Sequence, residues 1–422
     1  MLYLIAMVYL GLIYVRPNEL NEGWEEVPLV MMASVVAAPL LGWAIAQRRG
    51  RVFEMPQDRL LWLFWFAIVL SNLAAGWLGG GILGVTAFAQ VMFQYALIRS
   101  AVQTMPQLRG AIVLLTCYML FHATSGILQW NYGVGFGGIE PMTTDGALRI
   151  RSVGIFNDPN DLALSMLVVL PFLIVTVLEA SAGWTARIVS LAVLVPMLLA
   201  FYYTNSRGGV LGLAAAVVII GWRRFGSRLG PLVAVAGLAG VLALGPSRMA
   251  EMDAEEDSAQ GRIQAWSEGM QMLAGRPLTG VGYGRFTEYH AMVAHNSFVQ
   301  VLAELGLIGG AAFIGMVFWY FESLRRVARL PRFAQPPFRA WHTGFLAMGT
   351  AFFVSAGFLS RQYNPVLFTV IALGACFANL AKEKGSDLFA VSGSNRIRVF
   401  WLTIGTVAFI WLVARTFGSF GG

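Results

Sequence analysis

Apolar runs of roughly 20 residues recur along this sequence from one end to the other. As a helix, such a run spans about 30 Å, the thickness of a bilayer's hydrocarbon core. Of the 422 residues 57% are hydrophobic and only 12% are charged, whereas soluble domains carry about 25% charged residues. The pattern predicts an all-α polytopic membrane protein with about 12 to 13 transmembrane helices.

The candidate spans cover roughly residues 1–15, 27–46, 60–79, 82–98, 110–130, 160–179, 187–204, 208–222, 229–246, 296–321, 340–359, 366–381 and 398–417. The first and the twelfth are short, so the total is open by one. Residues 1–15 lack a basic leader and a cleavage pattern, which favours a retained span over a signal peptide.

The chain divides into three expected parts. N-terminal transmembrane helices occupy residues 1–130, and C-terminal transmembrane helices occupy 322–422. Between them, the core 131–321 holds a site at the outer face. It includes the loop 247–295, which we expect to contain short helices and to be the sizeable segment outside the membrane.

The distribution of basic residues predicts the orientation, because inner loops are enriched in Lys and Arg. With the N-terminus in the cytoplasm, most of the 29 Lys and Arg residues face inward. The inward turns are then 47–59, the turn with Arg99 and Arg109, 222–228, 325–339 and 382–398. This bias accounts for the net charge of +7 without nucleic acid.

Arginines that remain on the predicted outer side run against this bias. They are Arg149, Arg151, Arg207, Arg262, Arg276, Arg285 and Arg361. A planar guanidinium binds phosphate with two hydrogen bonds, which a lysine cannot do. Several such groups at a membrane-facing cavity suit a lipid-linked diphosphate. The alternative is that these side chains snorkel to headgroups or cap helices. Arg207 is the strongest candidate for a ligand contact, because it lies in a short turn and precedes Gly-Gly.

Three other features predict little chemistry of their own. The cysteines, Cys117 and Cys376, lie in apolar runs, which favours neither disulfides nor a thiolate metal site. The acidic run 251–257 lacks EF-hand spacing, so we interpret it as a solvated face or a helix start. The glycine-rich turn 280–286 lacks both the P-loop lysine and the context of a dinucleotide fingerprint.

The stretch from His295 to Gly309 opens with His-Asn-Ser and continues as an apolar run. If this run is a continuous helix, His295, Leu302, Gly306 and Gly309 share one stripe. A titratable imidazole then lies at a helix entrance, above glycines that let another backbone approach. Glu304 lies about 180° around that helix, which favours structural pairing with a neighbouring helix.

Upstream of this stretch, Arg262, Trp266 and Met270 recur at spacings of four residues. Such spacing predicts one face of a short helix that lies on the membrane. We expect Trp266 at the interface and Arg262 turned to the cavity.

This stretch resembles a motif of bacterial O-antigen ligases: His with Asn, Ser or Gln, nine residues, Gly, two residues, and Gly, Thr or Tyr. His295, Asn296, Gly306 and Gly309 fit it. Arg262, Trp266 and RPLTGVGYGRF, upstream of the histidine, are similar to the same superfamily.

Two further segments extend the resemblance to about residues 150–310. SRGGVLGL (206–213) is similar to the outer-turn arginine motif of these enzymes. RSVGIFNDPNDLAL (151–164) is similar to an Arg-Gly-Phe-Asn-Pro-Asn segment of O-antigen ligases and polymerases. The motifs are specific for the superfamily, but ligases and polymerases share them.

The resemblance implies a GT-C-like, lipid-carrier glycosyltransferase at the periplasmic face of a bacterial inner membrane. It implies a donor glycan on undecaprenyl diphosphate and membrane lipids as surroundings, with no metal, cofactor or nucleic acid. A ligase uses lipid A–core as the acceptor, and a polymerase uses another lipid-linked glycan. Two other classes stay open: a transporter or flippase, which would carry charges within spans and broken helices, and a scaffold.

A mechanism follows from the residue types. Neutral His295 takes the proton of the acceptor hydroxyl as general base. Arg207 and Arg262 stabilise the charge on the leaving diphosphate, with Arg149 and Arg151 as second-rank candidates. A structural histidine at a helix start is the alternative, and His290 competes from outside the motif.

Overall fold

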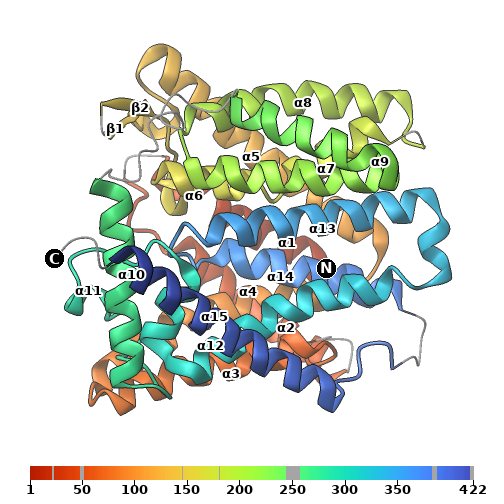
Figure 1. Cartoon of the computed structure of the whole chain (residues 1–422). Coiled ribbons are helices and arrows are strands. Elements are labelled where there is room, and N and C mark those ends of the chain that lie inside the picture. Colours follow the sequence, from red (N-terminus) through yellow and green to blue (C-terminus); the bar gives the residue numbers. More distant parts are fainter. Residues whose placement is uncertain are drawn as a thin grey trace.

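The computed structural model describes residues 1–20, 23–47, 52–144, 146–179, 181–243, 257–382 and 387–418. In this part the protein is all-α with one small hairpin (Figure 1). The α-helices are α1 (Leu2–Tyr14), α2 (Leu29–Ala46), α3 (Pro56–Ala74), α4 (Leu78–Ala101), α5 (Met105–Tyr132), α6 (Pro159–Met166), α7 (Leu170–Leu178), α8 (Trp184–Tyr203), α9 (Arg207–Ala243), α10 (Asp257–Gly275), α11 (Phe286–Tyr289), α12 (Ser297–Val327), α13 (Pro336–Ala356), α14 (Pro365–Ala381) and α15 (Gly393–Gly418).

The remaining elements are short. They are the 3-10 turns η1 (Pro17–Glu19), η2 (Phe136–Gly138), η3 (Gly154–Phe156) and η5 (Pro331–Ala334), and the strands β1 (Met142–Thr144) and β2 (Ala147–Arg149). The two strands pair antiparallel, with Thr143 opposite Leu148.

Among the described residues, 8 helices are long and apolar enough to cross a membrane, and Pro365–Ala381 is a shorter apolar helix. The protein is therefore a multi-pass membrane protein. Each predicted span coincides with helix, although 160–179 is divided into α6 and α7. The spans 208–222 and 229–246 form one element that reverses at Gly226 (φ 71°). Residues 244–246 lie outside the described part.

Most long helices run side by side, so the bundle has two ends (Figure 1). We call the end with β1, β2, α10 and α11 the site end; it lies on the left of the view. Helix α10 runs across this end rather than along the bundle. The acidic residues 251–256 of the loop 247–295 lie outside the described part of the chain.

Helix α12 is broken near its start, so the predicted continuous helix is wrong. Gly306 has φ 63° and ψ −162°, and the segment Pro277–Gly282 fills the break. Its amides at Val281 and Gly282 donate to the carbonyls of Ala303 and Glu304 (2.9 and 3.0 Å). In return, the amides of Leu307 and Ile308 donate to the carbonyls of Pro277 and Leu278 (2.8 and 3.2 Å).

This exchange satisfies the polar groups that the break frees, as burial requires. It also explains the glycine. A Cβ on Gly306 would lie 2.4 Å from the carbonyl carbon of Leu278. The prediction that another backbone approaches Gly306 therefore holds, but the partner is a loop. Gly309 instead faces the side chain of Leu305.

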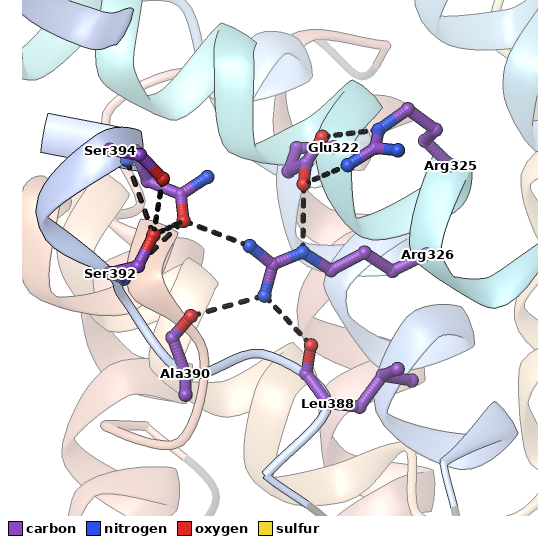
Figure 2. A network of polar contacts seen from close by, with 8 residues as sticks. Glu322, Arg325, Arg326, Leu388, Ala390, Ser392 and Ser394 are labelled. Carbon is purple, nitrogen blue, oxygen red and sulfur yellow. Dashed lines mark hydrogen bonds and ion pairs between the residues drawn. The ribbon is translucent and has the colours of Figure 1, made fainter. Parts of the chain in front are cut away.

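At the opposite end, Arg326 of α12 forms a local ion pair and also joins α12 to a segment that is distant in sequence. Figure 2 shows Glu322 accepting hydrogen bonds from Arg325 and Arg326 (2.6 and 2.8 Å for the two Nε atoms). Arg326 also donates to the carbonyls of Leu388 and Ala390 (2.8 and 3.1 Å), which ties α12 to the segment before α15 (Figure 2).

Candidate active site

His295 lies directly before α12 rather than inside it. The helix is capped by Asn296, whose side-chain oxygen accepts from the amides of Phe298 and Val299 (2.9 and 3.2 Å). With Asn296 as the cap, His295 leaves the helix and takes φ 46°, a left-handed conformation that is uncommon outside glycine. The prediction that His295, Gly306 and Gly309 share one helical stripe is therefore wrong, because His295 precedes the helix and Gly306 breaks it.

Helix α10 holds the residue that precedes the histidine. The indole Nε1–H of Trp266 donates to the carbonyl of Ala294 (2.9 Å), and Ala294 is buried. Close packing supports this contact, because a Cβ on Gly269 would lie 2.7 Å from Val299 in α12. The half-buried Trp266 thus has its indole N–H turned toward the protein, and its expected place at the membrane interface stays a prediction.

His295 is half-buried among charged groups. Burial lowers its pKa, Arg262 and Arg361 lower that pKa further, and Asp158 opposes the shift. The imidazole is therefore neutral at neutral pH. Its ring forms no hydrogen bond with any described residue. By contrast, the Nδ1 of His290, the competing candidate, lies 3.0 Å from the Met292 carbonyl of its own turn.

The charged neighbours of His295 come from three other elements. Asp158 caps α6, where its carboxylate accepts from the amides of Asn160 and Asp161 (2.8 and 3.3 Å). Asp161 forms an ion pair with Arg361, from the turn between α13 and α14.

A serine at the start of α12 anchors that turn. The amide of Arg361 donates to Ser297 Oγ (2.9 Å), and the Ser297 hydroxyl donates to the carbonyl of Leu359 (2.6 Å). Because Ser297 follows the cap of α12, Arg361 is fixed relative to the segment that carries His295.

Arg207 is the first residue of α9 and lies two residues after Asn205, which has φ 51°. The next two residues lie close to the elements around His295. A Cβ on Gly208 would lie 3.1 Å from Phe358 Cβ, and one on Gly209 would lie 3.0 Å from Ala163 Cβ in α6. The start of α9 is therefore wedged between α6 and the turn that carries Arg361.

The two remaining predicted arginines differ from each other. Arg149 is buried and donates to the carbonyl of Thr204 and to Asn160 Oδ1 (2.9 Å each). It thereby joins β2, the turn before α9 and α6. Arg151 donates to the carbonyl of Glu140 (2.9 Å), which directs its guanidinium to the segment before β1.

Glu304 is fully buried below the site and is paired, as its facing predicts. Its partners come from its own helix, from the turn before α14 and from the first residue of the short helix α11. It accepts from Gln300 (3.0 Å), from the hydroxyl of Tyr363 (2.8 Å) and from the amide of Phe286 (3.4 Å). The carboxylate thus joins the first part of α12 to the start of α11 and to the turn before α14.

Asp158 and Asp161 are candidate site residues to which the sequence analysis assigned no role. Arg361 was visible as an outward arginine, and Asp158 and Asp161 belong to the segment 151–164. Their meeting joins residues 200 positions apart in sequence, which no local pattern contains.

Comparison with protein families gives one match. Residues 192–314 match the O-antigen ligase family. No curated protein matches the chain. The matched segment carries Arg207, Arg262, Trp266 and His295, together with the broken part of α12, and the family is one of O-antigen ligase- and polymerase-type glycosyltransferases. Residues 192–314 are accordingly similar to the O-antigen ligase family, and this match supports the O-antigen ligase superfamily.

Proposed function

We propose that the protein is an O-antigen ligase that moves a glycan from undecaprenyl diphosphate to a hydroxyl of lipid A–core. The observation that carries this proposal is the setting of His295. Its imidazole makes no hydrogen bond to a described residue, its pKa is lowered, and Arg262 and Arg361 lie near it. A neutral base beside an anion-binding cluster is what transfer from a diphosphate requires.

The donor diphosphate is bound at the site end by arginines and helix starts. Arg262, Arg361 and Arg207 come from α10, from the turn before α14 and from α9. Helices α6, α9, α12 and α14 all begin in this region, and helix N-termini carry partial positive charge. Arg149 holds the start of α6 in place, and Arg151 has a peripheral role.

In the reaction, the acceptor oxygen attacks the anomeric carbon of the donor sugar. The new glycosidic bond forms as the bond to the diphosphate oxygen breaks. The hydroxyl proton passes to a ring nitrogen of His295, and the arginines stabilise the released diphosphate. Trp266 and Asn296 position the histidine from either side, and Gly306 admits the loop that fills α12.

An apolar groove offers a surface for the polyprenyl chain. It has a volume of about 590 Å³ and lies between α12, α13 and α15. Its lining includes Phe298, Ile314, Phe318, Leu346 and Leu402. Phe298, at one end of the groove, is three residues beyond His295, whereas Arg223, Glu322, Arg325 and His342 line its other end. A polyprenyl chain that enters at Phe298 would therefore have its diphosphate next to the site.

A transporter is the second candidate, because α12 is broken and transporters coordinate ions at broken helices. Here, however, the freed carbonyls of Ala303 and Glu304 accept from loop amides. A carbonyl already bonded in this way is a poor ligand for a transported ion. The bonding in the break therefore favours a structural role for it.

We place the site at the periplasmic face of the inner membrane. The basic turns 222–228 and 325–339 support this orientation. A periplasmic reporter fused after Arg262 should be active, and one fused after Arg325 should report the cytoplasm. If both report the same side, the proposed orientation is wrong.

The decisive experiment offers purified protein a lipid-linked glycan donor with either lipid A–core or a second lipid-linked glycan as acceptor. We expect product with lipid A–core, which His295→Gln abolishes and the matched His290→Gln leaves intact. Product only with the second lipid-linked glycan would identify a polymerase. Movement of the glycan across vesicles without transfer to either acceptor would support a transporter.

A further inference from the structure

At the end of the bundle opposite His295, arginines surround a cavity that the transfer reaction does not use. This basic cavity has a volume of about 570 Å³ and lies between α7, α9 and α13. Arg223, Arg224 and Arg339 line it. Among the residues that the structure describes, no carboxylate forms an ion pair with any of the three.

One acidic residue, Glu179, also lines the basic cavity, but its side chain is turned to its own loop. Its Oε1 accepts from the amide and the hydroxyl of Ser181 (3.2 and 3.1 Å). Arg224 donates to the carbonyl of Leu178 (3.2 Å), which fixes one side of the cavity. The balance of charge is therefore positive, and guanidinium groups are suited to phosphate.

A second apolar groove, different from the one lined by Phe298, adjoins the basic cavity. It has a volume of about 560 Å³ and lies between α5, α7, α8 and α13, which are neighbours in the upper half of Figure 1. Its lining includes Thr116, Cys117, Leu173, Val189, Val193 and Trp341.

The groove and the cavity are continuous, because Val175, Glu179, Ser181 and Ala340 line both. A fourth arginine, Arg109, lies at the groove, with its guanidinium carbon 5.8 Å from the ring centre of Trp341.

We propose that the basic cavity and the adjoining groove together bind one anionic phospholipid, with the phosphate among the arginines and an acyl chain in the groove. The two parts match the two parts of such a lipid in charge and in polarity. Basic pockets between transmembrane helices are a recognised form of lipid head-group site. The site lies at the end of the bundle opposite His295, so it is separate from the residues of glycan transfer, although Arg223 also borders the groove proposed for the polyprenyl chain.

The test measures lipids retained by the full-length protein in native mass spectrometry, after equilibration with equal amounts of phosphatidylglycerol and phosphatidylcholine. We expect one phosphatidylglycerol to be retained in preference. Arg223→Gln combined with Arg339→Gln should weaken its binding about tenfold or more, because charge-assisted hydrogen bonds are lost. Arg332→Gln removes an exposed arginine of the same end outside the cavity and serves as the matched control.

A second variant tests the groove alone. Cys117→Trp fills it and leaves the arginines in place, so it should also lose the retained lipid while its thermal midpoint without lipid is unchanged. Equal retention of both lipids by the wild-type protein would overturn the proposal. So would unchanged binding in Cys117→Trp, or stabilisation by inorganic phosphate as large as that by the lipid, because either result would indicate a simple anion site.

Discussion

Two Asp–Arg pairs lie at the two ends of the bundle, and they are built differently. At the end opposite His295, Arg99 and Asp58 have no exposed side-chain surface. The Asp58 carboxylate accepts from Arg99 Nε and Nη2 (3.0 and 3.1 Å), from the hydroxyl of Tyr95 (2.6 Å) and from the amide of Met55 (2.8 Å). At the site end, 27% of the Arg361 side chain and 11% of the Asp161 side chain are exposed.

This difference in exposure distinguishes a fully buried, structural ion pair from one that remains partly accessible. A buried ion pair is tolerated when further hydrogen bonds satisfy it, as they do for Asp58. Arg361 is partly exposed and lies, like Arg262, close to His295. Two histidines repeat the contrast. His122 contacts Ser152 Oγ and the carbonyl of Tyr14 with its two ring nitrogens (2.7 and 2.8 Å), whereas the His295 ring has no such bond to a described residue.

The largest expected effect is on catalysis at the open site. His295→Gln should lower turnover about 10²- to 10⁴-fold, because glutamine cannot accept the proton at neutral pH. Donor binding should stay nearly intact, since the arginines remain. Transfer rate and donor affinity, measured side by side with His122→Gln, check this. Near wild-type turnover would make His295 an orienting group.

His122→Gln tests the same contrast at the histidine whose two ring nitrogens are both hydrogen-bonded. It removes a saturated, buried group, so it should lower thermal stability and leave the turnover of the folded protein close to normal. His122→Gln could instead abolish turnover without a change in stability. In that case, hydrogen bonding of both ring nitrogens would not mark a structural histidine in this protein.

The second effect is on stability. Arg99→Gln should lower the free energy of unfolding by about 3–5 kcal/mol, because Asp58 stays buried without its charge partner. Arg361→Gln should cost less, since 11% of the Asp161 side chain is exposed, whereas none of the Asp58 side chain is. It should instead weaken donor binding. Thermal unfolding in detergent and a donor-binding assay check both variants. Equal destabilisation by the two changes would abolish the distinction between the two pairs.

The third effect concerns pH. A lowered pKa means that His295 loses its proton below its ordinary value of about 6.5, so activity should fall only as pH drops beneath that value. Arg262→Gln removes a charge that lowers this pKa, and should move the acid limb of turnover upward. Asp158→Asn removes the opposing charge, still caps α6, and should move the limb downward.

Each of these shifts should be up to about one unit. Turnover at saturating donor, measured from pH 5 to 8, checks them and keeps weakened donor binding out of the comparison. If the acid limbs of the two variants shifted in the same direction, or did not shift, His295 would not be the titrating group.

How far the sequence predicts these regions depends on the range of the interactions. Spans such as 110–130 and 296–321 are local patterns of length and polarity, and both coincide with helices. The break in α12 could not be predicted, because it lies inside an uninterrupted apolar run. The loop 277–282 creates it by supplying the missing hydrogen bonds, and only Gly306 hinted at a close approach.

The sequence predicts a candidate site residue only where that residue lies in a recognisable local motif. His295, Arg207 and Arg262 lie at one end of the bundle, and the motif names the first of them. The left-handed conformation of His295 depends on which residue caps α12. His295, Asn296 and Ser297 can each end a turn, so the sequence does not decide among them. Arg361 depends on contacts with Asp161 and Ser297, which are distant in sequence.

The smallest expected effect concerns the support of His295 from α10. Trp266→Phe keeps the ring but loses the hydrogen bond to the carbonyl of Ala294, a net loss of about 1 kcal/mol. Ala294 precedes a residue held at φ 46°, so this bond helps to keep His295 in its left-handed conformation. Turnover should therefore fall a few-fold, while donor affinity stays the same, because the arginines are not moved.

Trp184→Phe, at an exposed position of α8, is the matched control and should change neither quantity. Steady-state kinetics separate the outcomes: a positioning role lowers kcat at constant donor KM. A purely structural role would lower thermal stability and leave kcat unchanged. In that case the strained backbone at His295 would be maintained by the cap at Asn296 alone, and the open site would need less support from α10 than the geometry indicates.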